Sequence, residues 1–383
     1  MLNDPAYNRI FASGTLLAFL LSLSLNSAKC APLSGEVGTE AIPGVKTSGG
    51  CSIAVTPDGG TVYVGNVGTA NISVIDAKMM TETNVITVGD TPRDLLLSAD
   101  GGTLFCANYK GSSISIINTN SKAVSATIPV DEKPDALALS PDGQRLYVGT
   151  VSNSVDIIDT SANRVTKRIN VQASDTEGEI SRSVYTVAVS ADGHAIFVGG
   201  ALRGIRVLDA FSGARLAAIP VVNQELDSND PLMAMGGRPH IFSQEPAWAS
   251  WSLVTGMVLT NGGRCLVSRD VNADIQVTDC VSTRSLRQVK LAINDSQVGS
   301  QLLAVAGNLA YVLKGLFAQS LACVDLQKLT VSEIALKGTP SAVVANAGGS
   351  KIYVVDTNVL TRIDTTSNTV DGTTDLTKPF MIK

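Results

Sequence analysis

The stretch Val62-Tyr63-Val64-Gly65-Asn66 recurs along the chain, and its recurrence decides the fold. The clearest copies are Leu104-Phe105-Cys106-Ala107-Asn108 and Leu146-Tyr147-Val148-Gly149-Thr150. Weaker copies begin at Ile196, Cys265, Ala310 and Ile352. The first residues of the copies therefore lie 42, 42, 50, 69, 45 and 42 residues apart. A period in the low forties that is built from short strands is typical of β-propeller blades. Seven copies are enough to close a ring, in which each blade buries its faces against its neighbours.

Turn residues and further strands complete each repeat. In the third copy an apolar run over 135–140 precedes Pro141-Asp142-Gly143, a turn that proline and glycine both favour. Polar residues end the third strand of each copy, at Asp76, Asn118, Asp159, Asp209, Asp279, Asp325 and Asp364. No long 3.6-residue apolar period occurs beyond the N-terminal segment. The sequence therefore predicts an all-β chain that forms a seven-bladed β-propeller of four-stranded antiparallel blades.

Two of these copies resemble a known repeat. Residues 62–66 beside Thr56-Pro57-Asp58-Gly59, and residues 146–150 beside Ser140-Pro141-Asp142-Gly143, look like the YVTN-type β-propeller repeat of bacterial and archaeal surface-layer and periplasmic proteins. The resemblance covers residues 36–376, strongly in the first four blades and faintly in blades five and six. It implies a fold and not one function, because propellers include lyases, lactonases, cofactor carriers and binding proteins.

The composition limits the class of partner. The net charge is −5, charged residues make up 16% and aromatic residues 4% of the chain. The charges of both signs are interspersed without a basic stripe, which disfavours a nucleic-acid partner. The few aromatic residues disfavour recognition of sugars or bases by stacking over a wide surface. We expect a protein partner or a small-molecule ligand.

The N-terminal segment, residues 1–30, has the character of an export signal. Arg9 precedes an apolar stretch from Ile10 to Leu25, which is too short and too interrupted by serine for a membrane span. Asp4 and Lys29 depart from the pattern of a cleaved signal, so an uncleaved anchor is the alternative. We expect a periplasmic or secreted protein, which contacts a membrane only if this segment is retained.

The cysteines allow one cross-strand disulfide. Cys265 and Cys280 bracket the predicted hairpin of blade five at almost equal distances from its turn, and an oxidising compartment permits a disulfide between them. The alternative is two buried small apolar side chains. Cys106 occupies a strand position that Val64 and Val148 hold in other blades, so we expect it in the core.

Two insertions interrupt the period. The longer, residues 223–252, contains Arg238, His240, Trp248 and Trp251, and the shorter spans residues 172–181. Both lie between a fourth strand and the next first strand, so they open on one face of the ring, where loops on a rigid scaffold concentrate binding residues. The longer insertion provides apolar and polar groups for a small-molecule pocket, or else a small core of its own. The shorter one carries Asp175, Glu177 and Glu179, which suit Ca²⁺ or only a solvated loop.

A second set of candidate residues lies where the first strands begin. Alignment of the repeats on their turns gives one equivalent position, held by Cys51, Arg93, Asp135, Tyr185, Thr255, Gln301 and Ser341. Such variety is not required by a scaffold, which favours one repeated small residue. Arg93 and Asp135 lie in adjacent blades and either contact a ligand or pair with each other, because an unpaired buried charge is costly.

Catalytic patterns are scarce. The sequence has no histidine cluster for a metal, no Gly-x-Ser-x-Gly motif and no glycine-rich phosphate loop. We therefore predict an exported propeller that binds a partner or small ligand on its loop-rich face, without catalysis, cofactor or metal. The alternatives are a lactonase-like or lyase-like enzyme that uses His240, Tyr185, Arg93 and Asp135, or a haem carrier that uses His240 with Met233 or Met235.

Closure of the ring has two candidate strands. Residues 36–44 align with the fourth strands and are expected to form the outer strand of blade seven, which would seal the ring with strands from both termini. Residues 369–376 compete for the same place.

Overall fold

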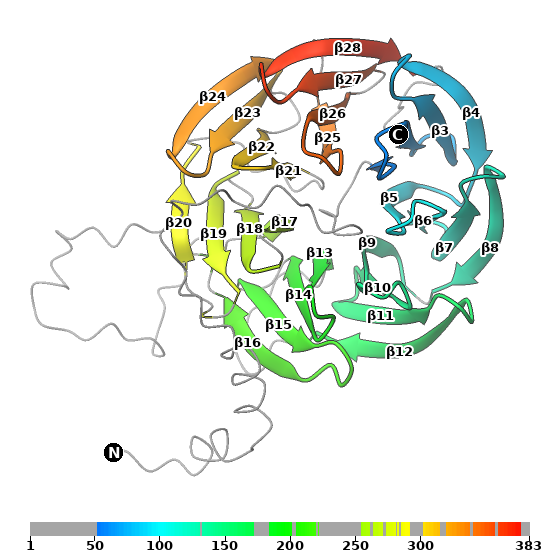
Figure 1. The fold of residues 1–383 in the computed structure, drawn as a ribbon. Helices are drawn as coiled ribbons and strands as arrows, with labels where there is room; N and C mark the ends of the chain where they lie inside the picture. Colours follow the sequence, from blue (N-terminus) through cyan, green and yellow to red (C-terminus); the bar gives the residue numbers. More distant parts are fainter. Residues whose placement is uncertain are drawn as a thin grey trace, which may run out of the picture. The chain divides into compact units, whose positions relative to one another are not determined.

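The chain forms seven four-stranded antiparallel sheets, which are the blades of one ring (Figure 1). The computed structural model describes residues 52–130, 132–171, 184–200, 204–219, 221, 254–260, 263–270, 273–280, 282, 285–291, 302–314, 319–337, 340–356 and 359–376. Within these ranges the chain contains strands and turns but no helix, and thus no helix that is long and apolar enough to cross a membrane. The predicted all-β, seven-bladed propeller is confirmed.

Each blade takes four consecutive strands, ordered from the propeller axis to the rim. Blade 1 consists of β1 (Ile53–Val55), β2 (Thr61–Asn66), β3 (Asn71–Asp76) and β4 (Thr81–Thr87). Blade 2 consists of β5 (Pro92–Leu97), β6 (Thr103–Asn108), β7 (Ser113–Asn118) and β8 (Ala123–Pro129). Blade 3 consists of β9 (Pro134–Leu139), β10 (Arg145–Thr150), β11 (Ser154–Asp159) and β12 (Arg164–Asn170). Blade 4 consists of β13 (Val184–Val189), β14 (Ala195–Gly200), β15 (Ile205–Asp209) and β16 (Arg215–Ile219).

The remaining three blades follow the same order. Blade 5 consists of β17 (Val254–Thr260), β18 (Cys265–Asp270), β19 (Ile275–Asp279) and β20 (Ser285–Val289). Blade 6 consists of β21 (Leu303–Ala306), β22 (Leu309–Leu313), β23 (Ser320–Asp325) and β24 (Thr330–Ala335). Blade 7 consists of β25 (Pro340–Ala345), β26 (Lys351–Asp356), β27 (Val359–Asp364) and β28 (Thr369–Asp375).

The repeated Ser/Thr-x-Asp-Gly turns are held by their own side chains. In blade 3 the Ser140 hydroxyl donates to Asp142 Oδ1 at 2.5 Å, and the same carboxylate oxygen accepts the Gln144 N–H at 3.0 Å. The turns of blades 1, 2 and 4 have the same two bonds, which are centred on Asp58, Asp100 and Asp192. Short polar side chains favour turns by bonding to nearby backbone in this way. The recurring sequence motif is therefore explained by the scaffold.

The carboxylates that end the third strands have a similar local function. Asp159 Oδ1 accepts the N–H groups of Ser161 and Ala162, both at 2.9 Å, and Asp364 Oδ1 accepts those of Thr366 and Ser367. These bonds start the turn that leads to the fourth strand. All seven polar residues that the sequence predicts at the end of a third strand hold that position.

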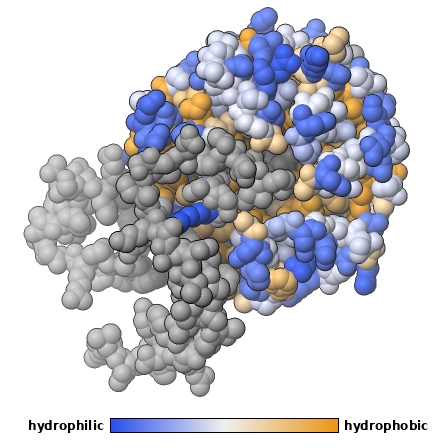
Figure 2. Space-filling view, in the orientation of Figure 1, coloured by the Kyte–Doolittle hydropathy of each residue, from blue (hydrophilic) through white to orange (hydrophobic). Residues whose placement is uncertain are grey.

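The apolar core is divided among the boundaries between blades. One cluster of buried side chains fills each boundary, so each blade packs on both of its neighbours. The cluster between blades 7 and 1 joins Ala342 and Tyr353 to Ile53 and Val62, which closes the ring by burial of apolar surface. In Figure 2 hydrophilic residues dominate the loops of the visible face, and hydrophobic residues show between the blades.

Closure of the ring differs from the expectation. Strand β28 pairs with β27 as the outer strand of blade 7, so the expectation that residues 36–44 take this place is wrong. Residues 36–44 themselves lie outside the described ranges. Besides the apolar cluster, the Arg362 guanidinium of blade 7 donates to the Ala77 carbonyl of blade 1 at 2.5 Å.

The register of blade 5 explains the cysteines. Strand β18 begins at Cys265, which pairs with Asp279, so Cys280 is one residue beyond the position opposite Cys265. A shift of one residue turns a side chain to the other face of a sheet. Cys265 accordingly packs in the core between blades 5 and 6, and Cys280 against the core between blades 4 and 5. No disulfide joins Cys265 and Cys280 in this structure, and Cys106 is buried in the core, as predicted.

Candidate functional site

The two faces of the ring differ in their connections. On one, called here the connection face, the fourth strands lead to the next first strands and the second strands lead to the third. The opposite face, called the turn face, carries the Ser/Thr-x-Asp-Gly turns. The ends of β12 and β16 and the starts of β13 and β17, which flank the two insertions in the sequence, lie on the connection face. The entry points of the first strands also lie on this face, nearest the propeller axis (Figure 1).

Five first strands carry a β-bulge at this entry. In β5 the strand pairing shifts register between Pro92 and Asp94, and an equivalent shift occurs at the start of the first strands of blades 3, 4, 5 and 7. A bulge leaves one residue outside the regular pairing and re-aims its side chain. These residues, called here the bulge ring, are Arg93, Asp135, Tyr185, Thr255 and Ser341.

The bulge ring confirms the equivalence of these five positions that the sequence alignment predicts. The two other aligned residues, Cys51 and Gln301, lie outside the described ranges. A bulge at one fixed position supports any side chain there without loss of the sheet. The scaffold thus places five different side chains around the axis, of which Asp135 and Thr255 are buried and Arg93, Tyr185 and Ser341 are half-buried.

Arg93 and Asp135 of the bulge ring pair with each other. Arg93 Nε lies 2.7 Å from Asp135 Oδ1, and the exposed fractions of the two side chains are 29% and 3%. The contact is an ion pair without regular hydrogen-bond alignment, since neither atom makes a hydrogen bond of good geometry among the described residues. Burial raises the pKa of Asp135 to about 6, and the charge of Arg93 acts in the opposite direction. The pairing alternative from the sequence is therefore confirmed, and contact of either residue with a ligand stays a prediction.

An aromatic ring extends this ion pair towards solvent. The Arg93 guanidinium carbon lies 4.5 Å from the centre of the Tyr109 ring, in the loop between β6 and β7. Lys133, in the connection that leads to β9, places its ammonium nitrogen 5.6 Å from the same ring. Cations within about 6 Å of an aromatic face are attracted to it. Blades 2 and 3 thus combine two cations, one aromatic ring and one buried carboxyl at the entry of their first strands.

The inner strands below this group are tied across the blade boundary. Asp94, adjacent to Arg93, is fully buried, and its Oδ2 accepts the Leu137 N–H of blade 3 at 2.8 Å. The Ser52 hydroxyl of blade 1 likewise donates to the Pro92 carbonyl of blade 2 at 3.1 Å. These bonds fix the positions of neighbouring first strands relative to each other along the propeller axis, and therefore the positions of the bulge residues.

The sequence reasoning missed Arg269, which holds the bulge residue of blade 5. Its side chain is 1% exposed and donates to Thr255 Oγ1 at 2.6 Å, to the Asp270 carbonyl at 3.0 Å and to the Leu313 carbonyl of blade 6 at 3.1 Å. Burial lowers its pKa to about 10, while the charges of Asp270 and Asp274 act in the opposite direction.

The register of the structure, which is one residue off from the sequence alignment in blade 5, shows what is unusual about Arg269. Equivalent positions in blades 3 and 4 hold Gly149 and Gly199, where an added Cβ would lie 2.6 Å from Val184 and 2.9 Å from Val254 of the next blade. The other blades hold glycine or an apolar residue at this position, so an arginine here indicates a boundary with different packing. Its fully buried hydrogen bonds brace blade 5 against blade 6 at the inner strands.

Four of the predicted site residues lie in a part of the chain that the structure does not describe. Arg238, His240, Trp248 and Trp251, and with them both insertions (residues 172–181 and 223–252), lie outside the described ranges. Tyr185 is half-buried at the start of β13. Among the described residues, no three His, Cys, Asp or Glu side chains form a group that is able to hold a metal ion.

Comparisons with known proteins agree on the architecture. A family model described as "Lactonase, 7-bladed beta-propeller" matches residues 36–127, a segment that includes blade 1 and blade 2 as far as the middle of β8. Among solved structures, a chain of Kuenenia stuttgartiensis hydrazine synthase is similar with a TM-score of 0.61 and 16% sequence identity; the match covers 91% of this chain and 99% of that chain. No curated protein matches this sequence. The chain is therefore similar in sequence to a seven-bladed propeller family over residues 36–127, and in fold to the hydrazine synthase chain over nearly its whole length.

Proposed function

We propose that the protein is an exported propeller that binds a small polar ligand, or a partner protein, at the bulge ring on its connection face, without catalysis. The bulge ring is the observation that carries this proposal. The turns between first and second strands of blades 1 to 4, by contrast, repeat one aspartate for a structural reason. At the bulge ring five equivalent positions hold five different side chains.

The chemistry of the ring suits a polar ligand. Arg93 is partly exposed, Lys133 is exposed, and both face Tyr109. These groups bind oxygen atoms and planar groups of a ligand by charge-assisted hydrogen bonds and stacking. In this proposal the insertion over residues 223–252, which connects β16 to β17, supplies the wall of the site, with Arg238, His240, Trp248 and Trp251 as contacts.

Ligand-induced shifts of the melting temperature test the proposal. We expect a ligand from the native host's metabolites to stabilise the wild-type protein, because a ligand that binds only the folded state raises its stability. Tyr185→Ala should remove this shift. Phe211→Ala is the matched control, since Phe211 is a 49% exposed aromatic residue on the turn face. Equal loss of the shift in both variants, or no loss in Tyr185→Ala, would contradict a site at the bulge ring.

The insertion gives an independent arm of the same test. Deletion of residues 223–247 should abolish the shift and leave the blades folded, because each blade packs mainly on its neighbours. A deletion variant that loses its cooperative unfolding would show instead that the insertion is a structural core. Export is tested separately: fractionation of the native host should find the mature protein outside the cytoplasm.

Lactone hydrolysis is the second candidate, and the match of residues 36–127 to the lactonase propeller model favours it. Asp135 would then be the general base, because a carboxyl group with a pKa of about 6 accepts a proton near neutral pH. Turnover of a panel of lactones that is lost in Asp135→Asn and retained in Asp156→Asn would establish the enzyme. Absence of turnover together with ligand binding supports the binding protein.

A further inference from the structure

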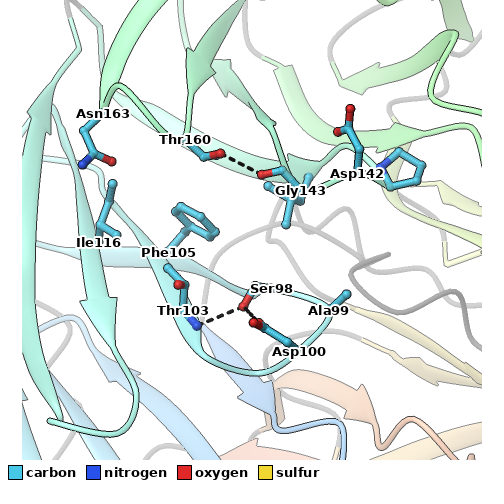
Figure 3. Close-up of a pocket in the computed structure, with 12 residues that line it drawn as sticks. Ser98, Ala99, Asp100, Thr103, Phe105, Ile116, Asp142, Gly143, Thr160 and Asn163 are labelled. Carbon is cyan, nitrogen blue, oxygen red and sulfur yellow. Dashed lines mark hydrogen bonds between the residues drawn. The ribbon is translucent and has the colours of Figure 1, made fainter.

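The turn face carries a groove between blades 2 and 3 that is separate from the bulge ring. Its volume is about 460 Å³, and the walls are formed by the first turns of the two blades and by β6, β7 and the turn after β11. Phe105 lies in the middle of the groove, with Asn163 towards one end and Asp100 and Asp142 towards the other (Figure 3). Small-molecule sites commonly have volumes of about 300–1,000 Å³.

The groove exists because one contact between neighbouring turns is missing. At most boundaries the first turn of one blade covers the next: a Cβ added at Gly101 would lie 2.9 Å from Pro57, one at Gly193 3.4 Å from Pro141, and one at Gly263 2.8 Å from Ala191. A Cβ added at Gly143 would meet nothing within 4 Å. Its covering residue would be Ala99, which holds the position of Pro57 and Pro141. Ala191 holds this position in blade 4 and does reach Gly263, so the gap at blade 3 reflects a wider separation of the two turns as well as the short side chain of Ala99.

A hydroxyl group is missing from the same place. Tyr311 of blade 6 donates its hydroxyl to Asn368 Oδ1 of blade 7 at 2.7 Å, and Tyr147 of blade 3 reaches the Ala210 carbonyl of blade 4 at 3.4 Å. The equivalents of Tyr311 and Asn368 at this boundary are Phe105 and Asn163. Phe105 offers a ring but no hydroxyl. The groove thus lacks both a proline ring and a phenol hydroxyl that other boundaries supply.

The open end of the groove is anionic. Hydrogen bonds from the Ser98 hydroxyl and the Gly102 N–H lower the pKa of Asp100. Those from Ser140 and the Gln144 N–H lower that of Asp142, with a smaller contribution from Arg145. Both groups are therefore carboxylates at neutral pH. Each uses Oδ1 for its own turn, which leaves Oδ2 for a ligand. The Arg145 guanidinium lies 4.3 Å from the Phe211 ring, at the next boundary.

We propose that this groove binds a small arylalkylamine, whose ring lies against Phe105 and whose ammonium group pairs with Asp100, while Asp142 adds negative charge on the facing turn. Ile116, Leu139 and Pro141 complete the apolar walls. A ring hydroxyl on the ligand would reach Asn163 and take the place of the tyrosine hydroxyl. The site lies on the opposite face from the bulge ring and does not depend on the proposed function.

Calorimetric titration of the full-length protein with tyramine tests this assignment. We expect tyramine to bind at least about tenfold more tightly than its neutral analogue 4-(2-hydroxyethyl)phenol, because one charge-assisted hydrogen bond contributes about this factor. Asp100→Asn should weaken tyramine binding by about the same factor. Asp58→Asn is the matched control, because Asp58 makes the same two turn bonds in blade 1, away from the groove.

Two further variants fill the groove. Ala99→Pro introduces the residue that blades 1 and 3 carry at this position, and Phe105→Tyr restores the hydroxyl; both should abolish tyramine binding without loss of melting temperature. Phe197→Tyr, the same change in blade 4, should leave binding unchanged. No tyramine binding to the wild type, equal binding of the neutral analogue, or an equal effect of Asp58→Asn and Asp100→Asn would overturn the proposal. If Ala99→Pro does not fold, the Asp100→Asn and Phe105→Tyr results decide.

Discussion

Removal of Arg93 should destabilise the protein in a manner that depends on pH. Asp135 is 3% exposed with Arg93 Nε 2.7 Å away, and its pKa is about 6 instead of the ordinary 3.8. A pKa raised on folding means that the protonated form stabilises the fold below about pH 4, and that this contribution is lost as the pH rises through about 6. At about 1.4 kcal/mol per pKa unit, ionisation of Asp135 already costs roughly 3 kcal/mol in the wild type. Arg93 limits this cost.

The expected loss in Arg93→Gln follows from this balance. Removal of one partner of a buried ion pair costs about 3–5 kcal/mol, and the partial exposure of Arg93 reduces this to about 2–3 kcal/mol. The loss of unfolding free energy should be large near pH 8, where Asp135 is ionised without its partner. It should be smaller near pH 5, where Asp135 is mostly protonated and carries no buried charge. Asp135→Asn cannot ionise, so Arg93→Gln in that background should cost less than about 1 kcal/mol.

Urea unfolding of the four proteins of this double-mutant cycle, at both pH values, measures these free energies. Lys328→Gln is the control, because the Lys328 side chain is 75% exposed and its pair with Asp325 should contribute less than about 0.5 kcal/mol. An Arg93→Gln loss that is equal at both pH values, or unchanged by Asp135→Asn, would refute the reasoning.

Three further predictions concern the scaffold. Asp58→Ala should lower the melting temperature near pH 7 and have a smaller effect near pH 2.5. The hydrogen bonds from Thr56 and Gly60 lower the pKa of Asp58, so the stability that the ionised carboxylate contributes is lost as the pH falls through this pKa. An equal effect at both pH values would contradict this. Tyr311→Phe removes the 2.7 Å bond to Asn368 and should cost about 0.5–1.5 kcal/mol in urea unfolding, whereas no change would show that this hydroxyl does not contribute. Thiol titration of the denatured, unreduced protein should detect the thiols of both Cys265 and Cys280. In the native protein Cys280 should be alkylated slowly, because burial raises its pKa. Two thiols that appear only after reduction would show that the disulfide forms.

The repeat pattern predicts nearly all of the fold because the blade-forming residues act locally. The turn aspartates bond to backbone within three residues, so their spacing is visible in the sequence. Blade 5 shows the limit of the pattern: its turn lacks the usual aspartate, and the alignment places Cys265 one residue too far along the strand. Ring closure was also ambiguous, since residues 36–44 and 369–376 both carry fourth-strand patterns and only the pairing of β28 with β27 decides.

The candidate site was predictable in part. The variety at one aligned position indicates the bulge ring, and adjacent opposite charges predict the Arg93–Asp135 pair. The bulges themselves were not predictable, because a register shift of one residue leaves no trace in strands of unchanged length. The contacts of Arg269 and the groove above Phe105 depend on the distance between neighbouring blades, which a single repeat does not encode.

Native mass spectrometry of the protein purified from its own host tests the central claim most directly. If the protein binds a ligand or partner at the bulge ring, the wild type should carry an additional noncovalent mass that dissociates unchanged, and Tyr185→Ala should lose it while Phe211→Ala retains it. Only the bare chain in all three proteins, or a bound species that leaves as a hydrolysed product, would contradict a noncatalytic binding propeller.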